Sequence, residues 1–139
     1  MGFNYTGSYQ DEDVTRERIA DGECYVMVER GVVTGTITIY PPSVSSLPQD
    51  TWYARPGIAA CGQFAVEPSR QRSGRGSALM AVVERRAALL GATELALDTA
   101  EAAEHLVRFY MNRGYRFIEY IQHEGKTYRS AVFSKAVIG

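Results

Sequence analysis

The sequence contains no lysine before Lys126, and this absence narrows the ways in which the chain could bind phosphate. The nucleotide-binding P-loop requires a lysine directly after its glycines, so that class of site is excluded upstream of Lys126. Cysteine and histidine are scarce too. Cys24 and Cys61 fit no CxxC or metal-binding spacing, and neither His105 nor His123 has a second ligand nearby in sequence. We therefore expect two reduced cytoplasmic thiols and no metal site.

The chain also lacks a dominant charge and a long hydrophobic run. Its 139 residues include 15 basic and 16 acidic side chains, so no overall basic field favours nucleic acid. No stretch approaches the ~18 apolar residues of a membrane span, and the polar start MGFNYTGSYQDED is no signal peptide. With 45% hydrophobic and 22% charged residues, the sequence predicts a single cytoplasmic domain over 1–139, without nucleic-acid or membrane partners.

Apolar residues recur with helix or strand periods along most of the chain. The charged segment 11–22 is expected to form a short helix, with Val14 and Ile19 on its apolar side and Gly22 as its cap. The other expected elements are two strands within 24–40 joined by a turn at 29–31, a loop at 41–50, strands at 58–66 and 93–98, helices at 77–91 and 103–114, and strands at 115–121 and 128–137 around a turn at 123–126. This order predicts an α/β domain of α+β character, a mixed sheet covered by helices.

A loop rich in glycine and arginine, SRQRSGRGS, joins the expected strand 58–66 to the helix after it. The first N–H groups of a helix have no partner within the helix, and the helix dipole makes that end positive. Gly74 and Gly76 allow a ligand to approach the backbone closely, because no Cβ intervenes. The loop therefore predicts a cradle for a phosphate-type anion.

A dinucleotide-binding fingerprint is one alternative for this loop. Segment 74–76 supplies two glycines after a strand, and Asp98 lies 22 residues beyond Gly76. The third glycine position holds Leu79, however, and seven residues separate the strand from the glycines, where that motif has a tight turn. A nucleotide-dependent oxidoreductase is therefore the weakest of the interpretations.

The segment QRSGRG matches Q/R-x-x-G-x-G, and through it the chain resembles the GNAT superfamily of N-acetyltransferases, in which this motif binds the pyrophosphate of coenzyme A. The stretch GQFAVEPSRQRSGRGSALM is similar to that family's fourth strand, loop and third helix, and LVRFYMNRGYRF to its FYxxxGF segment. The resemblance covers residues 11–137. It implies a GNAT-like mixed, mostly antiparallel sheet flanked by helices. Because only about ten residues precede the charged segment, it also implies either a reduced N-terminal front end or a sequence that begins late.

The resemblance implies a site for acetyl-CoA. The backbone of Phe64, Ala65 and Val66 would hydrogen-bond the pantetheine arm as if that arm were another strand of the sheet. The amides around the pyrophosphate would come from Gln71, Arg72, Ser73, Gly74, Arg75, Gly76 and Ser77. Tyr110 matches the family tyrosine that donates a proton to the departing thiolate. Ala103 stands where many members have an asparagine that touches the cofactor.

The acceptor amine needs a base, because an amine with a pKa of about 10.4 is mostly protonated at pH 7 and its deprotonation costs about 5 kcal/mol. Glu67, at the end of the expected cofactor strand, is the predicted base, acting directly or through a water. A solvated loop carboxylate is an equally good interpretation of Glu67. Glu29 and His123 are weaker alternatives, chosen by residue type alone.

Together these features predict an N-acetyltransferase that moves the acetyl group of acetyl-CoA directly to a primary amine, a small molecule or peptide, in a ternary complex. Neither cysteine has a histidine close in sequence that would make it a covalent relay. A non-catalytic acyl-CoA-binding module of the same fold is the alternative. Exposed sheet edges often pair with a second copy, which leaves a homodimer open.

Overall fold

The computed structural model describes residues 3–6, 12–18, 22–42, 51–67, 74–123 and 125–137. Its elements are β1 (Phe3–Thr6), β2 (Glu12–Arg18), β3 (Glu23–Glu29), β4 (Val32–Tyr40), the short 3₁₀ helix η1 (Trp52–Ala54), β5 (Ile58–Val66), α1 (Arg75–Leu89), β6 (Glu94–Ala100), α2 (Glu104–Asn112), β7 (Arg116–Ile121) and β8 (Ser130–Ala136). From β3 onward the strands and helices lie where the sequence predicts them. The loop expected at 41–50 falls largely outside the described residues.

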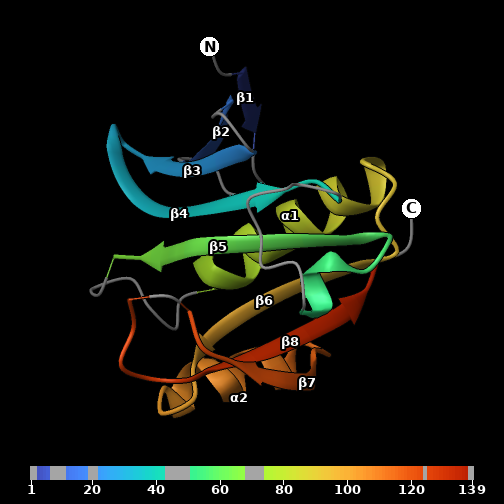
Figure 1. Cartoon of the computed structure of the whole chain (residues 1–139). Coiled ribbons are helices and arrows are strands. Elements are labelled where there is room, and N and C mark those ends of the chain that lie inside the picture. The colour runs from blue at the N-terminus through green and yellow to red at the C-terminus, as the bar shows by residue number, and fades with distance from the viewer. Residues whose placement is uncertain are drawn as a thin grey trace.

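The strands form one sheet in the order β1-β2-β3-β4-β5-β6-β8-β7. Within the described sheet, β5 and β6 are the one parallel pair, and α1 makes the crossover between them. The remaining neighbours are antiparallel, which confirms the expected mixed, mostly antiparallel sheet. Figure 1 shows α1 and α2 behind this sheet and η1 on the face towards the viewer.

The helix predicted over 11–22 is wrong, because Glu12–Arg18 is the strand β2. The helix prediction rested on two apolar residues and a cap, which is too little to hold a short helix in water. The outer edge of β3 offers an alternative: all seven residues of β2 pair with it, from Glu12↔Glu29 to Arg18↔Glu23. Pairing along a free sheet edge therefore overrides the local pattern.

The turn predicted between β3 and β4 is confirmed, and its backbone explains its sequence. Arg30 and Gly31 both have positive φ angles, +50° and +79°. Two central residues with positive φ are the mark of a type I′ turn, whose twist suits a two-residue hairpin.

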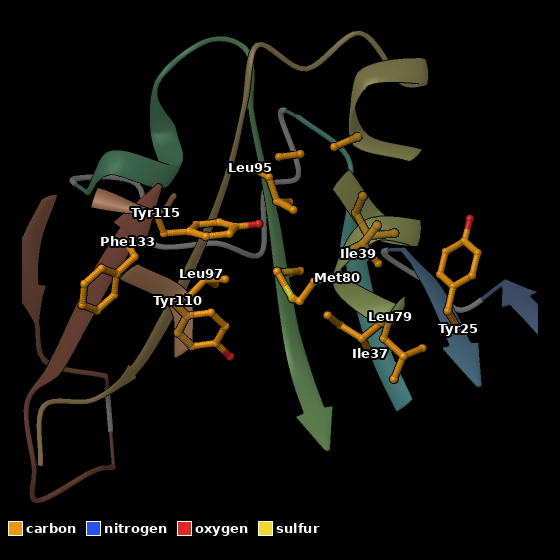
Figure 2. Packing of buried hydrophobic residues seen from close by; sticks show 14 of the residues in the cluster. Tyr25, Ile37, Ile39, Leu79, Met80, Leu95, Leu97, Tyr110, Tyr115 and Phe133 are labelled. Atoms are coloured by element: carbon orange, nitrogen blue, oxygen red, sulfur yellow. The ribbon is translucent and has the colours of Figure 1, made fainter. Parts of the chain in front are cut away.

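The main core lies between the sheet and the two helices. Leu79, Met80 and Val83 of α1 are fully buried against Ile37 and Ile39 of β4, and Figure 2 shows several of these side chains together with Tyr110. A smaller cluster lies on the opposite face. It consists of Tyr53, Ile58, Ala60, Ala96, Ile121 and Val132, with Tyr40, Trp52 and Ile118 at its margin. One face of the sheet is therefore covered by helices, and η1 packs on the other.

Gly22 offers a test of the packing between β3 and β4. A Cβ at this position would lie 2.3 Å from the carbonyl oxygen of Ile39, and no side-chain rotation relieves a clash with backbone. We expect Gly22→Ala to cost about 1–3 kcal/mol and to lower the melting temperature by several degrees. Gly62→Ala is the matched control, because its Cβ would meet nothing within 4 Å. Equal melting temperatures for the two variants would contradict this packing.

Candidate functional site

β5 and β6 diverge after a short stretch of pairing. They are paired only from Ile58↔Glu94 to Ala60↔Ala96, although β5 continues to Val66 and β6 to Ala100. On its other edge, β5 stays paired with β4 as far as Gly35↔Val66. The edge of Phe64, Ala65 and Val66 that faces β6 therefore has no strand beside it in the described sheet. An extended chain could hydrogen-bond there as an added strand would.

A bulge interrupts β5 where it diverges from β6. The register with β4 shifts between Thr36 and Thr38, and Gln63 has a φ of +52°. The hydroxyls of Thr36 and Thr38 donate to the backbone oxygen and the side-chain Oε1 of Gln63, at 3.3 and 3.0 Å. These bonds hold a conformation that is uncommon for a residue other than glycine.

The amino end of α1 has the features expected of an anion cradle. Gly74 is the N-cap, with a φ of +87°, and the first helical bond runs from the Ala78 amide to its carbonyl oxygen. The amides of Arg75, Gly76 and Ser77 therefore lie in the first turn, where helical partners are absent. No acidic side chain occupies that turn. Gln71, Arg72 and Ser73 lie outside the described residues.

Glycine is favoured at the two glycine positions of the motif for different physical reasons. Gly74 is required by its positive φ. At Gly76 the space is tight, because a Cβ there would lie 3.2 Å from Cζ of Phe64 and that ring would have to move by a few tenths of an ångström. The Arg75 guanidinium forms two bonds of 2.5 Å with the carboxylate of Glu29. Glu29, one of the two weaker base candidates, is therefore ion-paired at the end of β3.

Tyr110 of α2 lies beside the diverging strands. It is 4% exposed, and its ring centroid lies 6.3 Å from that of Phe64 of β5 and 6.5 Å from that of Phe133 of β8. Figure 2 shows Tyr110 beside Phe133. Burial raises the pKa of the Tyr110 hydroxyl, and the negative potential of Cys61 and Asp98 raises it further. The hydroxyl is therefore protonated at neutral pH and can act as a hydrogen-bond donor.

Glu67 follows directly after β5. Its amide donates to the carbonyl oxygen of Thr34 at 2.8 Å, which extends the β4–β5 ladder by one bond. Its neighbours in sequence, 68–73, lie outside the described residues. Glu67 is therefore at the end of β5 that leads into the glycine loop.

A cluster that sequence reasoning missed joins η1, β6 and the residues after β7. The Tyr53 hydroxyl donates to Oδ2 of Asp98, and Nε2 of His123 lies 2.9 Å from Oδ1 of the same carboxylate. The sequence indicates Asp98 only as the acidic residue of a dinucleotide fingerprint, and His123 only as a base candidate by residue type. No local signal could unite these residues, because they come from three separate segments.

The two thiols are free. Cys61 is buried and Cys24 is half-buried. Burial, followed by the charges of Glu84 and Asp98, raises the pKa of the Cys61 thiol. A neutral, buried thiol is a poor nucleophile. Across the described residues, no helix is both long and apolar enough to span a bilayer.

The amino-acid sequence matches a known protein family and one of its characterised members. The model of the acetyltransferase (GNAT) family matches residues 2–115. S-(2-succino)cysteine N-acetyltransferase of Bacillus subtilis is 28% identical over 120 residues, which cover 83% of this chain and 67% of that protein.

Solved structures show the same fold. A GNAT acetyltransferase from Elizabethkingia anophelis with acetyl-CoA bound has a TM-score of 0.65 at 18% identity, over 84% of this chain and 76% of its own. The ribosomal-protein-S18-alanine N-acetyltransferase of Escherichia coli has a TM-score of 0.66 at 14% identity, over 88% and 73%. The chain therefore belongs to the acetyltransferase (GNAT) family of acetyl-CoA-dependent N-acetyltransferases.

Proposed function

We propose that this chain transfers the acetyl group of acetyl-CoA directly to a primary amine, with both substrates bound at once. The divergence of β5 and β6 is the observation that carries the proposal. It leaves the backbone of Phe64, Ala65 and Val66 accessible to a strand-like pantetheine arm. The pyrophosphate would sit at the amino end of α1, held by amides from Gln71, Arg72, Ser73, Gly74, Arg75, Gly76 and Ser77.

Direct transfer is favoured over a covalent acetyl-enzyme. Cys61 is the thiol nearest the divergence of β5 and β6, but it packs in the main core among the buried residues of the helix-covered face. Its raised pKa keeps it protonated at neutral pH. The amine nitrogen would therefore attack the thioester carbon itself.

Tyr110 would stabilise the leaving sulfur as a hydrogen-bond donor. An ordinary phenol has a pKa of about 10 and a thiol about 8.5, so full proton transfer is uphill by about 2 kcal/mol. Burial raises the pKa of Tyr110 and makes that transfer harder still. The hydroxyl therefore donates a hydrogen bond as negative charge develops on sulfur and completes the transfer late.

The acceptor would be a small molecule or peptide with a primary amine. The Bacillus relative is named for S-(2-succino)cysteine, which makes that compound the first to assay here. Glu67 is the base candidate that the sequence provides, and its Gln variant belongs in the same assays. The proposal places the activity in the cytoplasm, where thiols stay reduced. A homodimer through the edge strand β7, which exposes Phe117 and Tyr120, is part of the proposal and is tested by sedimentation.

The first test is binding. We expect acetyl-CoA at about 100 times its Kd to add roughly 2.7 kcal/mol to the free energy of unfolding, a shift of several degrees in melting temperature. NAD at the same concentration should cause no shift. If NAD stabilises the chain and acetyl-CoA does not, the loop binds a dinucleotide and the proposal fails.

The second test is transfer. Tyr110→Phe keeps the packed ring and removes the donor, so we expect kcat to fall roughly 10- to 100-fold with little change in the Kd for acetyl-CoA. Release of the coenzyme A thiol measures the rate. Binding of acetyl-CoA without transfer to any amine would instead support the acyl-CoA-binding module.

A further inference from the structure

Asp98 is the centre of the Tyr53–Asp98–His123 cluster. One carboxylate oxygen accepts from the Tyr53 hydroxyl and the other faces Nε2 of His123 at 2.9 Å. An ionised carboxylate can only accept hydrogen bonds, so the proton between Asp98 and His123 belongs to Nε2. In the neutral imidazole the other ring nitrogen, Nδ1, then carries a lone pair. The structure gives Nδ1 no hydrogen bond among the described residues, and the His123 side chain is 34% exposed.

The fold places this cluster where β5 and β6 diverge. Asp98 lies two residues beyond Ala96, which is the last residue of β6 paired with β5. Because strand side chains alternate, Asp98 shares a face with Ala96, and this is the face on which Tyr53 and Ile121 pack. His123 lies two residues beyond Ile121, which is the last residue of β7. The cluster therefore faces away from the two helices.

Tyr110 approaches the same point from the helix-covered face. Its ring belongs to the main core, near Phe64 and Phe133. Its neighbour Phe64 lies in the part of β5 that is no longer paired with β6, and Asp98 lies in the corresponding part of β6. A hydrogen-bond donor and a carboxylate-bound imidazole therefore lie on opposite faces of the sheet, both beside the stretch where β5 and β6 diverge.

The direction of the pantetheine arm favours this point for the reaction. Coenzyme A carries its pyrophosphate and its thiol at opposite ends of that arm. With the pyrophosphate at the amino end of α1, the thioester would reach back along β5 towards its divergence from β6. Glu67 stands at the opposite end of this path, next to the glycine loop.

We propose that His123 is the catalytic base that deprotonates the acceptor amine, and that Asp98 and Tyr53 are positioning residues that fix its tautomer and orientation. This inference rests on the proposed acetyltransferase function. It replaces Glu67 as the preferred base, and Glu67 becomes the alternative that the experiment must separate from it.

The proton balance of this step is complete. The alkylammonium gives one proton to Nδ1 of His123, and the freed lone pair attacks the thioester carbon. As the tetrahedral intermediate collapses, the carbon–sulfur bond breaks and its electron pair goes to sulfur. Tyr110 supplies a proton to the thiolate, and the second proton of the nitrogen passes through solvent to the Tyr110 phenolate, which restores the hydroxyl. His123 then releases the first proton to solvent, so the net reaction yields the amide, the thiol and one proton.

Charged and titratable groups surround the cluster. Neighbouring elements bring Asp98 from β6, Tyr53 from η1, Cys61 from β5 and Glu119 from β7, and the turn that follows His123 contains Lys126, whose backbone amide donates to the carbonyl oxygen of His123. Glu119 accepts a hydrogen bond from the Trp52 amide at 2.7 Å. The guanidinium groups of Arg55 and Arg116 lie over the Trp52 ring, 4.9 and 5.7 Å from its centroid. The groups around the cluster therefore carry both signs of charge.

The experiment compares four variants of the full chain, His123→Gln, His123→Ala, Glu67→Gln and His105→Gln. His105, the other histidine of the chain, is exposed on α2 and serves as the matched control. The acceptors are S-(2-succino)cysteine, L-lysine, spermidine and a short peptide with a free amino terminus, assayed by thiol release from pH 6 to 9. Calorimetry gives the Kd for acetyl-CoA, and circular dichroism verifies folding.

We expect His123→Gln to lower kcat at pH 7 at least about 100-fold, with the Kd for acetyl-CoA unchanged within about twofold. The deficit should narrow as the pH approaches the pKa of the amine, because the free amine then forms without a base. Imidazole in solution should partly restore His123→Ala, which a merely structural residue would not allow. His105→Gln should match the wild type.

Two results would overturn the inference in different ways. If wild-type chain transfers acetyl groups and His123→Gln does so equally well, while Glu67→Gln is impaired, the base is Glu67 and the proposed function survives. If the wild-type chain binds acetyl-CoA but acetylates none of the four amines, the proposed function and this inference fail together.

Discussion

Valine in place of Gly74 is expected to raise the Kd for acetyl-CoA at least about tenfold. Gly74 caps α1 with a φ of +87°, a conformation in which a β-branched residue is a genuine outlier. An L-residue with this conformation carries a strain of about 1–2 kcal/mol. The backbone would shift to relieve the strain, and the first-turn amides would then no longer face the pyrophosphate. A loss of 1.4 kcal/mol in binding is already tenfold in Kd.

Gly91 provides the matched control for Gly74 at the other end of the same helix. Its φ is +88°, and an added Cβ would meet nothing within 4 Å. Gly91→Val therefore introduces the same backbone strain about four turns away from the proposed cradle. We expect both variants to melt at similarly reduced temperatures, but only Gly74→Val to bind acetyl-CoA weakly in calorimetry. Equal affinities would show that the amino end of α1 does not hold the pyrophosphate.

Removing the charge of Glu84 is expected to destabilise the chain by about 2 kcal/mol at neutral pH. The Glu84 carboxylate, on α1, accepts two hydrogen bonds from Arg113 at 3.0 and 2.9 Å and one from the Tyr115 hydroxyl at 2.7 Å. Lys135 of β8 lies 3.5 Å away. Glu84 therefore ties α1 to the end of α2 and to the last strand, and Glu84→Gln leaves those partners with a weaker acceptor.

The effect of Glu84 should depend on pH. Burial alone would raise the pKa of this carboxyl, but the hydrogen bonds from Arg113 and Tyr115 outweigh it and hold the pKa below its ordinary value. A group whose pKa is lower in the folded state stabilises above its unfolded pKa, and the stabilisation is lost as the pH falls through the folded pKa. Denaturant titrations from pH 7 to 3 should therefore show the gap between wild type and Glu84→Gln closing below about pH 4.5.

Glu101 is the control for Glu84. It pairs with Arg129 at 2.8 Å, but both side chains are largely exposed, at 39% and 52%. Exposed pairs of this kind contribute little, so Glu101→Gln should remain within about 0.5 kcal/mol of the wild type at every pH. If Glu84→Gln behaved in the same way, the Glu84 network would be a surface pair and not part of the core.

Local chemistry made much of this protein predictable from its sequence. The alternation in Val32–Tyr40 and the turn at Arg30 and Gly31 specify a hairpin whatever surrounds them. The helical spacing of Leu79, Val83 and Ala87 specifies α1 in the same way, because one buried face is enough to define a helix. The glycine motif and Tyr110 were visible as short patterns that resemble those of the GNAT family.

Contacts between distant segments decided the rest. Residues 12–18 form a strand because the edge of β3 offers them seven backbone pairs, which no property of their own sequence reveals. The divergence of β5 and β6 depends on where two strands stop pairing. Tyr53, Asp98 and His123 are 45 and 25 residues apart, and each is unremarkable alone. Sequence determined the strands and helices from β3 onward and the glycine motif, because their causes are local. Tertiary structure decided the pairing of the first strands and the Asp98 cluster, because these contacts join separate segments of the chain and form only when the sheet is assembled.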